Sequence, residues 1–202
     1  FERAAAVDAD IDEPAVRESL AAIRARGEDA AADGDDDGGA PERVEPPAES
    51  GPARVVADAD VLAADLLVGG PARDAVDLAR AHSWVTLVAS EPLLDDAEAV
   101  VADCADPALA ADWREKVASL PELVDQPSGD HPALASAYNG EAEHLLSFDG
   151  RLRSATAGAT LRQYVDVSVR APRAFVSLFD PESIYEVAVG GDYPGPDRDP
   201  RA

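Results

Sequence analysis

Short apolar runs alternate with longer amphipathic stretches from residue 54 to residue 189. Four runs are short, rich in β-branched or aliphatic residues and bounded by turn-forming residues, which predicts strands. They are RVVAD (54–58), WVTLVAS (84–90), EHLLS (143–147) and YVDVSV (164–169). Helices are predicted over 60–67, 71–82, 91–103, 107–119, 131–139, from the loop 148–152 to about 163, over 172–179 and over 181–189. Strands separated by helices predict an α/β fold, a three-layer sandwich whose central parallel sheet has four to five strands.

The ends of the chain differ from this alternating region. Residues 12–27 carry Val16, Leu20 and Ile23 at helical spacing, which predicts a helix. Residues 28–53 are a mixture of Gly, Pro, Asp and Glu that cannot bury a core, which predicts a linker. We therefore expect a helical extension with an acidic flexible linker over 1–53, one folded domain over 54–190 and a mobile tail over 191–202.

The charge of the chain is far from balanced. The formal net charge is −24, and Lys116 is the only lysine. In about 1 M salt the Debye length falls to roughly 3 Å, so such a surface would repel itself much less. An acidic, lysine-poor surface is typical of proteins from halophiles with a saline interior. Cys104 is the only cysteine, which excludes an intrachain disulfide and a C-x-x-C pair. No apolar run reaches the ~18–20 residues of a membrane span, so we expect a cytoplasmic protein without a membrane partner.

Several acidic residues lie just after predicted strands or near the beginnings of predicted helices. Asp58 ends the first strand and Asp60 opens the next helix, while Asp149 follows the third predicted strand. Asp130 precedes a helix, and the pair Asp95–Asp96 lies one turn into another. Because the carboxyl ends of parallel strands meet at one edge of a sheet, these carboxylates are expected to converge there. Converging carboxylates repel unless a cation lies among them, and all-oxygen ligands suit Mg²⁺ or Mn²⁺.

Three segments together resemble the PIN-domain family of metal-dependent ribonucleases. They are VVADADVLAADLL, LVASEPLLDDAEAVV and DHPALASAYNGEAEHLLSFDGRL, and VSVRAPRAFVSLF is similar to the family's terminal strand and helix. The resemblance covers roughly residues 54–180. It implies the catalytic acids Asp58, Asp96, Asp130 and Asp149, with Asp60 as a further metal ligand and Asp95 as the other register for the second acid. The family usually has Glu at that second position.

The resemblance also implies the reaction and its partners. The reaction is hydrolysis of an RNA phosphodiester with Mg²⁺ or Mn²⁺, leaving 5′-phosphate and 3′-hydroxyl ends. Ser147 stands at a Thr/Ser position and is expected to hydrogen-bond a ligand carboxylate or a phosphate. The arginines after the fourth acid, Arg151, Arg153 and Arg162, are expected to contact RNA phosphates. An antitoxin or a second copy of the chain is the protein partner that the family implies.

Two further interpretations stay beside the nuclease. One is a PIN-like domain with a decayed site that binds RNA or protein, and Asp130 serves equally well as a simple helix cap. The other is a phosphatase of the haloacid-dehalogenase type, which Asp58-Ala-Asp60 resembles. That interpretation fails on residue order, because its lysine would precede the acidic pair, whereas Lys116 follows Asp95–Asp96.

Overall fold

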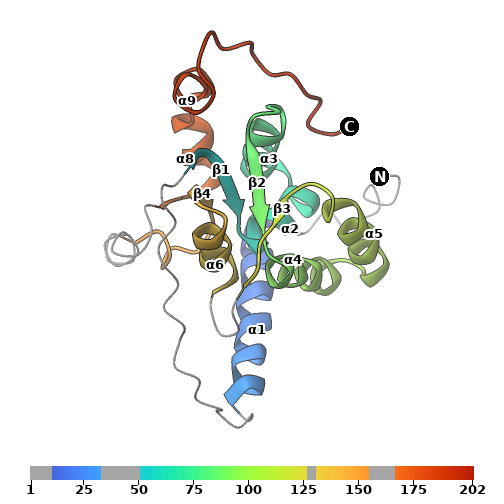
Figure 1. Ribbon diagram of the computed structural model, residues 1–202. Coiled ribbons are helices and arrows are strands. Elements are labelled where there is room, and N and C mark those ends of the chain that lie inside the picture. Colours follow the sequence, from blue (N-terminus) through green and yellow to red (C-terminus); the bar gives the residue numbers. More distant parts are fainter. Residues whose placement is uncertain (1–10, 33–50, 127–130, 155–166) are drawn as a thin grey trace.

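The computed structural model describes residues 11–32, 51–126, 131–154 and 167–202. Within them, parallel strands form one sheet in the order β3-β2-β1-β4-β5 (Figure 1). The strands are β1 (Gly51–Ala57), β2 (Thr86–Ala89), β3 (Glu122–Leu123), β4 (Ala142–Leu146) and β5 (Ser168–Arg170). This confirms the predicted α/β fold with a central parallel sheet.

Helices fill the connections between the strands. In chain order they are α1 (Glu13–Ala32), α2 (Ala59–Leu67), α3 (Gly70–Arg80), α4 (Glu91–Cys104), α5 (Pro107–Val117), α6 (Pro132–Asn139), α8 (Pro172–Leu178) and α9 (Pro181–Ala188). None of the helices in the described part of the chain combines the length and the hydrophobicity needed to cross a bilayer.

The strand order explains why helices cover both faces of the sheet. The chain moves from β1 to β2 to β3 in one direction and then returns past β1 to β4, and right-handed crossovers place the helices of the two halves on opposite faces. Figure 1 shows α6 on the near side of the sheet and α3 on the far side. Both helical layers pack on one apolar core, in which Val55, Val56 and Leu145 are fully buried.

Polar side chains begin several of these helices. The carboxylate of Asp106 accepts hydrogen bonds from the N–H groups of Ala108 and Leu109 at the start of α5. The hydroxyl of Ser90 accepts one from Leu93 N–H at the start of α4. Such caps satisfy N–H groups that have no partner within the helix. They fix where each helix leaves the sheet, and therefore where its first residues point.

Helix α1 is the predicted N-terminal helix, and it packs onto the folded domain. Val16 is 0% and Leu20 4% exposed, and both lie in the core. The helix packs against α4 and α2, and Figure 1 shows it standing beyond the ends to which the strands point. It also continues to Ala32, past the predicted end at residue 27, and β1 begins at Gly51. The predicted linker was therefore too long at both ends.

One strand and one contact of the tail were not predicted. Residues 122–123 form β3, which none of the predicted runs covers, because two residues are too few to show a periodic pattern. In the tail, residues 191–202, Arg201 forms ion pairs with Asp65 on α2 and with Asp77 on α3. Asp130, Arg162, most of the predicted helix ending near 163 and residues 164–166 lie outside the described residues.

Candidate functional site

The candidate site lies where the chain reverses its direction across the sheet. β1 pairs with β2 on one side and with β4 on the other, so the reversal falls between β1 and β4. In open parallel sheets, ligands bind at the carboxyl ends of the strands beside such a reversal. Asp58 follows β1 directly, and the segment Ser147–Asp149 follows β4 directly. The fold therefore places these acids at the position where parallel sheets bind ligands.

Asp58 is the buried centre of the site. Its side chain is 0% exposed. One oxygen, Oδ1, accepts from Arg24 Nη2 at 2.8 Å and from Ala59 N–H at 2.8 Å. The other, Oδ2, accepts from Ser147 Oγ at 3.0 Å. Both oxygens are thus satisfied, which removes most of the cost of burying a carboxylate.

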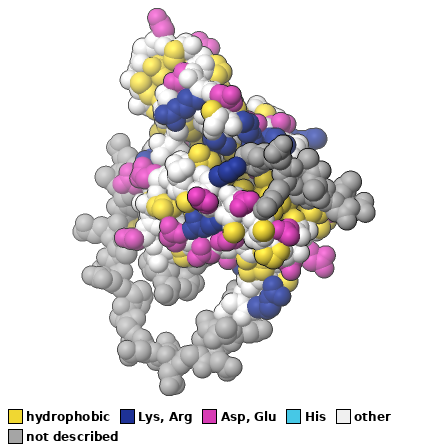
Figure 2. All heavy atoms as spheres, turned by 90° about the vertical axis from the view of Figure 1, so that its right-hand side faces the viewer, with side chains coloured by type: hydrophobic (Ala, Val, Ile, Leu, Met, Phe, Trp, Pro, Cys, Tyr) yellow, Lys and Arg dark blue, Asp and Glu magenta, His cyan; other side chains and the backbone are white. Residues whose placement is uncertain are grey.

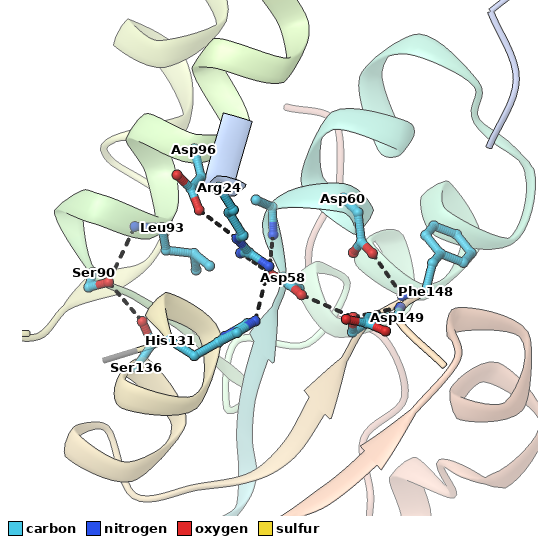
Figure 3. Close-up of polar contacts among 12 residues, drawn as sticks. Arg24, Asp58, Asp60, Ser90, Leu93, Asp96, His131, Ser136, Phe148 and Asp149 are labelled. Atoms are coloured by element: carbon cyan, nitrogen blue, oxygen red, sulfur yellow. Dashed lines mark hydrogen bonds and ion pairs between the residues drawn. The ribbon is translucent and has the colours of Figure 1, made fainter. Parts of the chain in front are cut away.

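Arg24 reaches this centre from α1 and joins it to two other elements (Figure 3). Its Nε lies 2.9 Å from Asp96 Oδ2 on α4, and its Nη1 lies 3.0 Å from His131 Nε2 at the start of α6. A guanidinium only donates hydrogen bonds, so Nε2 must accept and the imidazole is neutral. Burial, together with the charge of Arg24, lowers the pKa of His131 despite the opposing effect of Asp58.

Asp60 is the second buried acid. It is 2% exposed, and its Oδ2 accepts from Phe148 N–H at 3.1 Å. Its Oδ1 is buried and has no hydrogen-bond partner among the described residues. Burial and then the charge of Asp58 raise the pKa of Asp60 well above its usual value. The two acids are therefore tolerated because Arg24 pairs with Asp58 and because the raised pKa of Asp60 favours its neutral form.

Asp149 and its neighbours form the outer side of the site. Ser147 is 0% exposed, and its hydroxyl oxygen accepts from Asp149 N–H at 3.0 Å, so it links Asp149 to Asp58. Of the two expected bonds of Ser147, the structure has the one to a carboxylate. Arg151 Nη2 lies 3.1 Å from Asp149 Oδ2, and its own side chain is 88% exposed. Partial burial raises the pKa of Asp149, but hydrogen bonds from Arg151 outweigh it and hold this pKa below its usual value.

The other predicted site residues that the structure describes lie around Asp58 and Asp149. Asp96, and not Asp95, turns toward Arg24; the Asp95 side chain is 68% exposed and approaches Arg114 instead. Arg153 donates from Nη2 to the carbonyl oxygen of Phe148 at 3.0 Å. We call Asp58, Asp60, Asp96 and Asp149 the acid cluster from here on.

The acid cluster suits a hard divalent cation by its chemistry but not by its present spacing. All its donors are carboxylate oxygens, and Asp60 Oδ1 has no partner among the described residues. Within the described residues, however, no three acidic, histidine or cysteine side chains are grouped so that they could hold one ion. The guanidinium of Arg24 already takes up oxygens of Asp58 and Asp96. An ion at this place would have to compete with Arg24.

The sequence prediction missed Arg24 and gave His131 no role in the site. A signal for Arg24 was present, because it follows Leu20 by four residues and Val16 by eight. It therefore lies on the apolar face of the predicted helix. An arginine on a face that otherwise enters the core needs a buried acidic partner. The sequence does not say which of 41 acidic residues that partner is.

Comparisons with known proteins complete the description. No curated protein and no solved structure matches the chain. One family model matches residues 49–201, which is more than half of the chain and leaves out α1. The chain belongs to that family, a family of unknown function (DUF7384).

Proposed function

We propose that the protein is an endoribonuclease that uses Mg²⁺ or Mn²⁺ and hydrolyses RNA at the acid cluster. One observation carries the proposal: acidic side chains from three separate parts of the chain gather around a buried carboxylate at the reversal point of a parallel sheet. A fold gains no stability by collecting like charges in this way. The resemblance to the PIN-domain family, carried by the same acids, supports the same reaction.

The chain's own residues have distinct roles in this proposal. Asp58, Asp96 and Asp149 would hold the ion, and Asp60 or Asp130 would position a second ion or the attacking water. A bound divalent ion would lower the pKa of a coordinated water and neutralise charge on the phosphoryl oxygens. The exposed guanidinium of Arg151 stands beside Asp149, where it can contact an RNA phosphate. We place this activity in the cytoplasm, where RNA is available.

Arg24 is the cation that neutralises two members of the acid cluster before a metal binds. Its side chain is 19% exposed, and it pairs with both Asp58 and Asp96. A divalent ion that binds both acids must displace this guanidinium. Metal affinity is therefore expected to be low in the wild-type protein and higher when Arg24 is replaced by a neutral residue.

Calorimetric titration of Mn²⁺ into the wild-type protein and Arg24→Gln tests this proposal. We expect Arg24→Gln to bind Mn²⁺ about tenfold more tightly, which corresponds to roughly 1.4 kcal/mol. Arg24→Gln combined with Asp58→Asn should lose the binding. Asp95→Asn is the matched control, because Asp95 is adjacent to Asp96 but exposed, and its affinity should equal that of the wild type. If neither the wild type nor Arg24→Gln binds Mn²⁺, the nuclease proposal is wrong.

The presence of Arg24 also favours a second candidate function. A fixed arginine that already neutralises the acids is compatible with a PIN-like domain that no longer binds metal and serves as an RNA- or protein-binding module. The Mn²⁺ titration distinguishes the nuclease from the binding module, because only the nuclease should bind the ion. RNA binding gives a second distinction. A module of this kind should bind RNA equally well with and without Mn²⁺, and Asp58→Asn should not change its RNA affinity.

A further inference from the structure

A cavity of about 470 Å³ lies outside the acid cluster. Residues of α2, α3, β2 and α5 line it, and no residue of the acid cluster does. Its volume falls within the roughly 300–1,000 Å³ that small-molecule sites occupy. Nothing in the proposed nuclease reaction uses this space.

The interior of the cavity is apolar. Its wall includes Leu62, Val76, Leu87, Val88, Trp113 and Val117. Apolar surface of this kind gains free energy when it is removed from water by an apolar ligand. The body of a ligand that fits here is therefore hydrocarbon-like.

Basic side chains accompany this apolar wall. Arg73, Arg80, Lys116 and Arg201 line the cavity, against the two acids Asp65 and Asp77. Four bases and two acids give a local charge of +2 in a chain whose net charge is −24. Figure 2, which faces the side that carries α5 and the C-terminus, shows acidic side chains spread widely and smaller groups of basic ones beside hydrophobic ones. A positive cavity on such a protein favours an anionic group.

Arg80 is the base best placed to meet that anionic group. Asp65 is paired with Arg73 and Arg201, and Asp77 with Arg201. Arg80 forms no ion pair with any described residue. Burial and the nearby charge of Arg201 lower the pKa of Arg80. An anion beside Arg80 would offset the positive charge of Arg201 and stabilise the partly buried guanidinium.

We propose that this cavity binds an amphipathic anion, an unbranched or ring-bearing hydrocarbon that ends in a carboxylate, with the carboxylate at Arg80. The apolar wall selects the body of the ligand, and the excess of positive charge selects its head group. The site is separate from the acid cluster, so this proposal stands whether or not the protein cleaves RNA.

Fluorescence of Trp113 provides a direct test. In Trp84→Phe, Trp113 is the only tryptophan, and it lines the cavity. Decanoate, decanol and decyltrimethylammonium would be titrated below their micelle concentrations, in a salt concentration at which circular dichroism shows a folded protein. We expect saturable binding, with decanoate at least about tenfold tighter than decanol and the cation weakest.

Two variants and one control locate the site. Arg80→Gln should reduce decanoate affinity to that of decanol, whereas Arg173→Gln, at an exposed position on α8, should leave it unchanged. Leu87→Phe, which narrows the cavity, should weaken the binding of decanoate and decanol alike. It replaces Arg80→Gln as the test variant if Arg80→Gln does not fold. The proposal is overturned if decanoate does not saturate, if decanol binds as well as decanoate, or if Leu87→Phe binds both as the wild type does.

Discussion

The balance of charge around Asp58 depends on one arginine. Asp58 is fully buried, Asp96 is 20% exposed, and both pair with Arg24. Removing one partner of a buried ion pair leaves an uncompensated charge, which costs far more than the pair itself contributes. The stability of the whole site at the end of β1 and β4 therefore responds to changes at Arg24.

Replacing Arg24 by Gln should destabilise the metal-free protein by about 3–5 kcal/mol. Arg17→Gln on the same helix is the control, because Arg17 is 45% exposed and its ion pair is an exposed one with Glu13, one turn away. It should cost less than about 0.5 kcal/mol. Urea unfolding without divalent metal measures both values. Equal effects of the two substitutions would show that the Arg24 pairs do not stabilise the site.

The raised pKa of Asp60 predicts how the stability of the protein depends on pH. Its pKa is raised in the folded state, so folding favours the protonated carboxyl. The contribution is fully present below the usual pKa of an aspartate and is lost as the pH rises through the raised value. Asp60→Asn removes this loss, so the difference in thermal midpoint between Asp60→Asn and the wild type should shift in favour of the variant as the pH rises from 4.5 to 8. A lower midpoint for Asp60→Asn at pH 8 than at pH 4.5, relative to wild type, would contradict this account.

The elements of the domain differ in how clearly the sequence shows them. Strands β1, β2 and β4 and the helices α2 to α6 were predicted because each carries several periodic residues. Strand β3 has two exposed residues and joins the sheet only by pairing with β2, which a local pattern cannot reveal. The tail is held by Arg201 reaching Asp65, a contact between residues far apart in the chain.

The candidate site was predictable to the same degree. Asp58, Asp60 and Asp149 follow from strand ends, because parallel strands bring those ends to one edge. Asp96 was assigned from the resemblance to the PIN-domain family. Arg24 could not be assigned to them, because α1 is separated from β1 by residues whose pattern indicates no fixed geometry. The local sequence pattern thus predicts the acidic residues, whereas Arg24, the cation that pairs with them, is placed by long-range packing.

The packing of His144 on β4 against α8 gives a second prediction of how stability depends on pH. His144 is 5% exposed and packs edge-on against the rings of Phe175 and Phe179. Burial, with the charge of Arg170, lowers the pKa of His144 to about 4. The stability that depends on neutral His144 is present above pH 6.5 and is lost as the pH falls through 4, by up to about 3 kcal/mol. His144→Leu should lose less stability than the wild type between pH 7 and pH 4.5 in urea unfolding. An identical loss in both proteins would refute the role of His144.

The whole molecule carries a charge of −24, which predicts that its stability depends on salt. Repulsion among the acidic side chains is screened within about 3 Å at 1 M ionic strength. The thermal midpoint should rise by at least about 6 °C between 0.1 M and 2 M KCl, or roughly 2 kcal/mol for a domain of this size. A midpoint that stays constant or falls with KCl would contradict the proposed adaptation to a saline interior.

At this scale, the proposed function depends on the acid cluster acting as one catalytic centre. The most direct measurement is cleavage of a single-stranded RNA with Mn²⁺ by the wild type, Arg24→Gln, Asp149→Asn and the control Asp95→Asn, with end-group analysis of the products. We predict 5′-phosphate products and faster cleavage by Arg24→Gln than by the wild type. The rate should fall by about 100-fold or more in Asp149→Asn and remain unchanged in Asp95→Asn. Cleavage that is absent from both wild type and Arg24→Gln, or equal in Asp149→Asn and wild type, would contradict the account.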